Sequence, residues 1–375
     1  MIRLCVSLVL FSLVSVSVYA YSRYQRRLAE QAVWYEAEST KTPTNAADTE
    51  TFEAAASPDN PFQITDLSTY DYYRQPLKDW CNEGNGVVSY QGQRYRRNTY
   101  VKAILVMGVD RKDKLTEEAV TDYYGTGNAD AMFLLAQDTA HNTIRILMLP
   151  RDAIAKMDLM DLEGNVVGTA VQNLTLSWSY GDGGKKSAEN AVKTVSNMLC
   201  GLKIDQYAAA NMALLGEVND AVDGVTVTIP NDELIKTVPE WTKGKTVTLH
   251  GGEAETFLRY RDITMDNAAN FRMQQHREYM LGFYDAVRKK SRTDSNIITE
   301  LYDLLQDHMI TDMPKDRILK LGLDTINTGN LTEEDILSLP GIAKAADESW
   351  PWDRVYVDYG NAIPMILELF YREIG

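Results

Sequence analysis

"VKAILVMGVD", residues 101 to 110, is a nearly continuous apolar run that ends on an aspartate. Such a run predicts a buried strand. Further strands are predicted at 131 to 138, 143 to 150 and 225 to 230, and helices at 187 to 199 and 274 to 288. Because strands alternate with helices, we expect an α/β fold in three layers, α/β/α, around a mixed central sheet.

The N-terminal segment from Leu4 to Tyr21 holds 18 residues without a charge. This length is just enough to cross a bilayer, so we predict a transmembrane anchor over residues 1 to 21. A cleaved signal peptide is the alternative, because Val18 and Ala20 resemble the small-residue pattern before a cleavage site.

The charges beside this segment favour an orientation with the bulk of the chain inside the cell. Arg23, Arg26 and Arg27 follow it, whereas only Arg3 and the amino terminus precede it. Local counting of positive charges would place the bulk of the chain inside the cell, although that rule weakens for large translocated domains.

Composition divides the rest of the chain. Residues 22 to 62 are rich in Thr, Ala, Pro and acid, which predicts a disordered tether. Residues 63 to 100 form a lead-in segment with a hairpin that turns at Gln91-Gly92. The main domain is predicted at 101 to 290.

After Lys290 the sequence becomes mainly helical, and we predict a helical C-terminal extension over residues 291 to 375. Within it, "LTEEDILSL" (331 to 339) begins with Thr332 as a cap, followed by two glutamates in the first turn.

The charge balance limits the partners. The chain has 375 residues and a net charge of −15, which argues against general nucleic-acid binding, because that needs a basic face. Any anion site must therefore be local. Cys81 and Cys200 could pair in an oxidising compartment, and would be free in the cytosol.

Two aspartates mark strand ends. Asp110 follows one buried strand and Asp130 precedes the next. Carboxylates at the rim of an α/β sheet suit Mg²⁺, and the alternative is that both cap turns. Arg151 and Asp152 lie at the end of a third strand, where an adjacent arginine and aspartate are usually a surface pair of little energetic value.

Arginines concentrate between residues 257 and 278. Arg259 and Arg261 share a side if this segment is extended, and Arg272 precedes a helix. Paired guanidinium hydrogen bonds suit phosphate, so three converging arginines indicate a diphosphate site, with a solvated basic face as the alternative. His276 is expected on the helix as a polar residue.

Seven motifs in order carry a family resemblance: "AILVMGVD", "ADAMFLLAQD", "IRILMLPRD", "LTLSWSYGDGG", "AVDGVTVTIP", "LHGGEAETFLRYR" and "NFRMQQHRE". Over Val101 to Arg288 the chain resembles the LytR-CpsA-Psr family of membrane-anchored cell-wall glycopolymer transferases. This resemblance implies a single-pass protein of the cell membrane, with its folded domain on the extracellular side.

The resemblance also implies a reaction. The family moves a glycan, with its proximal phosphate, from a polyprenyl pyrophosphate lipid to a peptidoglycan hydroxyl. Asp110 and Asp130 would hold Mg²⁺, with Mn²⁺ as the alternative, and Asp152 or a metal aspartate would assist the hydroxyl. The pyrophosphate contacts implied are Arg151, Arg259, Arg261, Arg272 and His276.

The chain departs from the family's pattern in three places. Asn128 and Asn173 stand where an arginine and a lysine are usual, and Gln275 with His276 replaces part of the last motif. Up to three phosphate contacts are therefore expected to be lost or replaced. The alternative function is a non-catalytic, regulatory protein that binds polyprenyl pyrophosphate or the cell wall.

Overall fold

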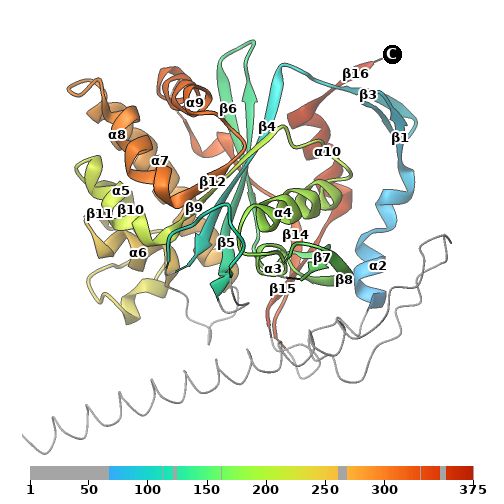
Figure 1. Cartoon of the computed structure of the whole chain (residues 1–375), viewed down its shortest axis with the longest axis horizontal. Coiled ribbons are helices and arrows are strands. Elements are labelled where there is room, and N and C mark those ends of the chain that lie inside the picture. Colours follow the sequence, from blue (N-terminus) through green and yellow to red (C-terminus); the bar gives the residue numbers. More distant parts are fainter. Residues whose placement is uncertain are drawn as a thin grey trace, which may run out of the picture. The chain divides into compact units, whose positions relative to one another are not determined.

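The computed structural model describes residues 67–374, apart from 112, 121–124, 162, 261–267, 330 and 347–351 (Figure 1). The predicted anchor and tether lie outside these residues. Among the residues described, no helix is both long and apolar enough to span a bilayer.

A six-stranded mixed sheet forms the centre of the fold, which confirms the predicted sheet type. Its order is β12-β9-β4-β5-β6-β13. β4 pairs in parallel with β9 and antiparallel with β5, and β6 pairs in parallel with β13. The strands are β4 (Val101–Asp110), β5 (Asn128–Asp138), β6 (Thr143–Leu149), β9 (Gln206–Asn211), β12 (Met309–Thr311) and β13 (Ile336–Ser338).

Helices cover both faces of this sheet (Figure 1). Alternate residues of β4, such as Leu105 and Met107, pack with α3 (Leu176–Ser179), α4 (Lys185–Met198) and α10 (Tyr359–Phe370). Phe133 and Ile146 point to the other face, where α7 (Ala268–Lys290) and α9 (Lys315–Asn327) lie. The period-2 alternation of apolar side chains thus supplies two cores.

The predicted C-terminal extension is wrong as a separate, mainly helical unit. Residues after 290 supply both edge strands of the central sheet, β12 and β13. They also form α8 (Ile297–Leu305), β14 (Gly341–Lys344), β15 (Arg354–Val357) and β16 (Tyr371–Ile374). The boundary at 290 fails because these strands, of three or four residues, are too short to show a periodic pattern.

"LTEEDILSL" illustrates the same error. Thr332 does cap a turn, with its backbone N–H bonded to the Asp335 carboxylate at 2.9 Å, but the helix is a short 3-10 turn, η6 (Glu333–Asp335). β13 follows at once, because Ile336 and its neighbours pair with β6.

The lead-in segment contains the predicted hairpin. β2 (Val87–Tyr90) and β3 (Gln93–Arg97) pair across Gln91 and Gly92, both with positive φ, as a two-residue hairpin turn requires. β1 (Trp80–Gly84) and the C-terminal β16 complete a four-stranded sheet. Cys81 and Cys200 are free.

The remaining elements surround this frame. α4 and α7 confirm the two predicted helices, whereas β10, predicted at 225 to 230, pairs only with β11 in a small sheet of its own. The other elements are α2 (Leu67–Tyr73), η1 (Gln75–Asp79), β7 (Ile154–Met160), β8 (Val166–Asn173), η3 (Met212–Leu214), α5 (Leu215–Ala221), β10 (Val225–Thr228), η4 (Glu233–Lys236), β11 (Thr246–Leu249), α6 (Gly252–Arg259) and η5 (Gln306–His308).

Candidate functional site

The predicted aspartates and Arg151 lie together at one edge of the central sheet. This edge is formed by the ends of the central strands, not by the edge strands β12 and β13. Because β4, β5 and β6 are antiparallel neighbours, the end of β4, the start of β5 and the end of β6 meet there. Asp110, Asp130, Arg151 and Asp152 all lie at this edge. Gly127, at φ +75, passes so close to the Asp110 carbonyl that a Cβ would lie 2.6 Å from its oxygen.

A β-bulge directs Asp130. Gly108 pairs with Ala131 and Val109 with Ala129, so Asp130 is the extra residue on β5. Bulges of this kind re-aim a side chain at the rim of a sheet. Asp130 consequently joins Ala131 and Phe133 in lining a cavity on the α7 side of the sheet.

Arg259 forms an ion pair with Asp110. Its Nη2 lies 2.7 Å from Asp110 Oδ2, and its Nη1 donates to Glu255 one helical turn earlier at 2.7 Å. Arg259 is the last residue of helix α6, so it is helical and not extended as predicted. Arg261 itself lies outside the described residues.

Arg151 links the other two carboxylates. Its Nη1 lies 2.7 Å from Asp130 Oδ2, and its Nε lies 3.6 Å from Asp152 Oδ1. Asp152 is buried, whereas Arg151 is partly exposed, so this is not the ordinary surface pair that adjacent residues suggested.

Thr175 completes this arrangement and was missed from the sequence. Its hydroxyl donates to Asp130 Oδ1 at 3.1 Å, its N–H donates to the Arg151 carbonyl at 2.9 Å, and it is buried. It occurs in the quoted "LTLSWSYGDGG" motif, but a single threonine just before a short helix carries no chemical signal of its own. Its position beside Asp130 and Arg151 results from contacts between segments that are distant in sequence.

A cavity of about 20 Å³ lies between α7 and the group of Asp130, Arg151 and Asp152. Its polar lining includes Asp130, Arg151 and Arg272, while Phe133 and Met273 contribute apolar walls. Arg272 is the fifth residue of α7 and is buried, rather than preceding the helix. This volume holds about one water molecule, so a diphosphate enters only after side chains move.

His276 also lines the cavity, but its Nε2 is engaged. Nε2 lies 3.0 Å from the Leu258 carbonyl, beside Arg259. Burial, together with the positive charge of Arg272, lowers the pKa of His276 from 6.5 to about 4. The neutral ring therefore donates from Nε2 to Leu258, and its Nδ1 offers an acceptor, not a donor, to a phosphate oxygen. Its predicted phosphate contact stays a prediction.

The three departures from the family's pattern have structural partners. Asn173 donates to the Asp353 carbonyl at 2.9 Å and to Asp152 Oδ1 at 3.5 Å. Gln275 is buried and donates to Glu233 at 3.4 Å. Asn128 lies opposite Asp110 in the sheet. Asn173 thus lies beside Asp152 but is bonded mainly to the Asp353 carbonyl, and it brings no positive charge.

The donor set at this edge suits Mg²⁺ better than a metal that needs a closed site. In the part of the chain that the structure describes, no three His, Cys, Asp or Glu side chains cluster as metal ligands. Mg²⁺ commonly takes one or two protein carboxylates and completes its shell with water and substrate phosphates. Asp110 and Asp130, each paired here with an arginine, are the carboxylates at this edge that would hold such a metal.

Comparison with known proteins assigns the chain to a family. The LytR_cpsA_psr family matches residues 78–350, which is most of the chain, and the chain therefore belongs to that family.

Individual relatives are more distant. The chain is similar to the polyisoprenyl-teichoic acid--peptidoglycan teichoic acid transferase TagT of Bacillus subtilis (strain 168), with 27% identity over 58% of this chain and 61% of TagT. It is also similar to biofilm regulatory protein A of Streptococcus mutans, with 30% identity over 44% of this chain and 38% of that protein. The matches therefore span less than two thirds of either relative.

The fold has counterparts among solved structures. Protein gbs0355 from Streptococcus agalactiae aligns over 72% of this chain and 87% of its own, with a TM-score of 0.55 and 19% identity. This likeness supports the fold alone.

Proposed function

We propose that this protein is a Mg²⁺-dependent phosphotransferase that moves a glycopolymer from a polyprenyl pyrophosphate carrier to peptidoglycan. The observation that carries the proposal is the pairing of two carboxylates with two arginines at one sheet edge, Asp110 with Arg259 and Asp130 with Arg151. The name of TagT, a teichoic acid transferase acting on peptidoglycan, supports the substrate class.

Arginine and carboxylate have separate tasks in this proposal. Arg151, Arg259 and Arg272 bind the pyrophosphate oxygens, since guanidinium groups match phosphate geometry. Asp110 and Asp130 would hold Mg²⁺, or Mn²⁺, which would offset the charge that develops on the phosphate. Asp152, or one of the metal aspartates, would accept the proton of the attacking hydroxyl, and the position of Asp152 beside Arg151 supports this role.

The carrier lipid needs an apolar path next to these charges. Met132, Met148 and Met273 line the same cavity as Asp130 and Arg272. Methionine side chains are flexible and repack at low cost, so this wall can open for a polyprenyl chain.

The test is conversion of a polyprenyl pyrophosphate saccharide by the full chain, in detergent, with and without Mg²⁺. Transfer or hydrolysis that needs the metal supports the proposal. Lipid binding without turnover under Mg²⁺ or Mn²⁺ supports a regulatory binding protein instead. Two observations support that second function. Asn173 and Gln275 are neutral, and biofilm regulatory protein A is by its name a regulatory protein.

We also propose that the folded part lies outside the cytoplasmic membrane, held by the N-terminal segment. The reaction class requires access to peptidoglycan. A protease added to cells that lack an outer barrier should release the folded part by cutting between residues 22 and 62, and full protection would contradict this location.

A further inference from the structure

A second hollow lies at the opposite ends of the central strands, between these strands and α9. Its volume is about 550 Å³. We call it the α9 groove, and define it by Lys102, Gln137, Gln206, Arg317, Lys320 and Asp324. Lys102 and Asp110 lie near opposite ends of β4, roughly 26 Å apart at about 3.3 Å per residue, so the groove is separate from the aspartate–arginine site.

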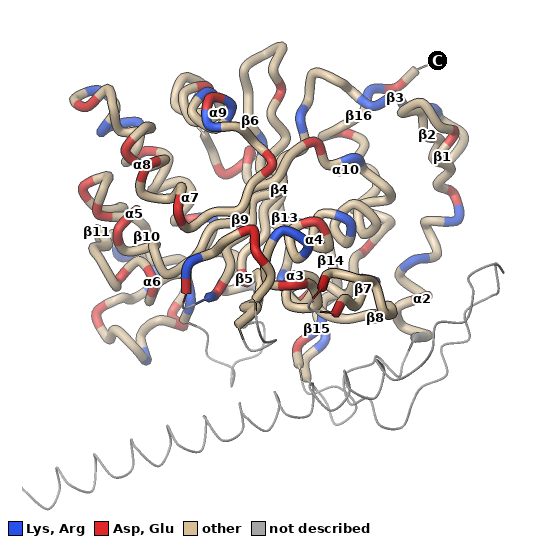
Figure 2. The backbone as a smooth tube through the Cα atoms, viewed as in Figure 1, with Lys and Arg blue, Asp and Glu red and all other residues tan. Residues whose placement is uncertain are grey.

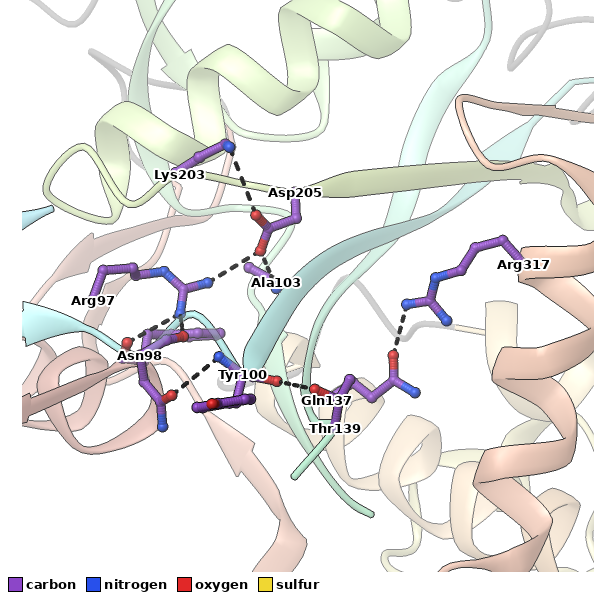
Figure 3. Close-up of polar contacts among 10 residues, drawn as sticks. Arg97, Asn98, Tyr100, Ala103, Gln137, Thr139, Lys203, Asp205 and Arg317 are labelled. Carbon is purple, nitrogen blue, oxygen red and sulfur yellow. Dashed lines mark hydrogen bonds and ion pairs between the residues drawn. The ribbon is translucent and has the colours of Figure 1, made fainter. Parts of the chain in front are cut away.

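Arg317 is held in the groove by neutral partners. Its Nη2 donates to Gln137 Oε1 at 2.7 Å, which Figure 3 shows, and its Nε donates to Gln206 Oε1 at 2.9 Å. Within the described residues, no carboxylate lies within ion-pair distance of Arg317. The guanidinium is therefore held in a fixed orientation by neutral groups.

Gln137 explains why the nearby Asp324 does not neutralise Arg317. Gln137 is only 2% exposed, and its amide Nε2 donates to Asp324 Oδ2 at 3.2 Å while its oxygen accepts from Arg317. Asp324 is paired instead with Lys320, at 2.8 Å. The buried amide thus separates the two charges.

Lys102 adds a second positive charge. It lies directly opposite Gln137 on the neighbouring strand, so both side chains emerge on the α9 face. The described part of the chain provides Lys102 with no hydrogen-bond or ion-pair partner. Asp205, which also borders the groove, is engaged by Arg97 at 3.2 Å and by the Ala103 N–H at 2.9 Å (Figure 3).

The groove continues along the surface. Gln206 also borders a second hollow of about 550 Å³, where Lys185, Lys193 and Lys203 lie with Glu189 and Asp312. Lys193 is already paired with Asp158. Elsewhere acidic residues are frequent, as on helices α5, α6 and α8 (Figure 2). Cationic side chains outnumber carboxylates in both hollows, three to two in each, so a path along them suits a chain of repeated anions better than one small ion.

We infer that the α9 groove binds a phosphodiester group of an extended anionic glycan polymer, with Arg317 and Lys102 as the anchoring charges. Guanidinium donors preorganised by neutral amides form charge-assisted hydrogen bonds to phosphate oxygens without first breaking an ion pair. This site differs from the proposed catalytic edge in place and in residues, and binding at it needs neither metal nor turnover.

The experiment measures binding of fluorescently labelled poly(glycerol phosphate) to the full chain in detergent, without Mg²⁺, by fluorescence anisotropy. Lys102→Gln should weaken binding about fivefold and Arg317→Gln about tenfold, and higher salt should weaken wild-type binding. Lys243→Gln is the matched control, because Lys243 is exposed and borders neither hollow. It should bind as wild type.

Three further arms decide between sources of the anion. If inorganic phosphate competes as well as the polymer at equal phosphate concentration, the groove does not recognise an extended polymer. If poly-glutamate binds with equal affinity, the groove attracts any polyanion and does not recognise phosphodiesters. Arg259→Ala should keep polymer affinity, since it alters only the other edge. Arg317→Gln removes hydrogen bonds that hold α9, so the deciding variant is Lys102→Gln, which changes a half-buried surface residue. If Lys102→Gln binds the polymer with wild-type affinity, the proposed site is wrong.

Discussion

Arg259 Nη2 lies 2.7 Å from Asp110 Oδ2, so a residue proposed to hold phosphate and one proposed to hold metal are partners of each other. Arg151 and Asp130 repeat this relationship. Binding either ligand alone must break an ion pair and leave its other member unpaired. Binding both at once gives each member a new partner, so Mg²⁺ and pyrophosphate should bind cooperatively, and reciprocally.

Arg259→Ala tests this coupling. Without its arginine, Asp110 is released, and Mg²⁺ should bind the ligand-free protein about threefold more tightly, as expected for a partly exposed ion pair. Pyrophosphate affinity should fall about tenfold. Isothermal titration of the full chain with each ligand measures both. If Mg²⁺ affinity stays the same or falls, Arg259 does not compete for Asp110.

Asp130→Asn separates metal chemistry from lipid binding. The amide keeps the size of the carboxylate but loses its charge, so turnover should fall about 100-fold or more if Asp130 holds Mg²⁺. Affinity for the pyrophosphate lipid should change less than about threefold, because arginines carry it. Equal losses in both measurements would make Asp130 a lipid contact.

Thr175→Val tests a positioning role. The variant removes the hydroxyl that donates to Asp130 Oδ1 at 3.1 Å. A hydrogen bond to a charged group contributes about 1.5–3 kcal/mol, so the Mg²⁺ concentration for half-maximal rate should rise at least about tenfold. Thr175→Ser should restore it. A melting temperature lowered with an unchanged metal requirement would leave Thr175 a structural role only.

His276 should make stability depend on pH. Its pKa is about 4 in the fold against 6.5 for the free side chain, so between these values the unfolded chain binds a proton that the folded chain does not. Stability should therefore fall as pH drops from 6.5 to 4, by up to about 3 kcal/mol in total. Urea unfolding of wild type and His276→Gln measures this, and parallel pH profiles would contradict it.

The sequence predicts the middle of the fold better than its edges. β4, β5 and β6 carry long apolar patterns, and α4 and α7 carry helical ones. β12 and β13 have three residues each, and only their pairing with β9 and β6 defines them as strands. Short strands of this kind are determined by tertiary contact, not by local propensity.

The site shows the same division. The strand-end positions of Asp110, Asp130 and Arg151 follow from the apolar runs beside them. The bulge at Asp130, the helical state of Arg259 and the hydroxyl of Thr175 depend on contacts between segments far apart in the chain. Residue type and spacing alone cannot indicate such contacts.

The late position of β12 and β13 in the chain has a consequence for biosynthesis. While the nascent polypeptide emerges, β9 and β6 expose unpaired edges until residues 309 to 338 arrive. Open strand edges recruit other chains, and pairings distant in sequence form slowly. A chaperone that shields these edges would therefore be needed until residues 309 to 338 have emerged, and a polypeptide stopped at residue 290 should aggregate rather than yield a smaller working protein.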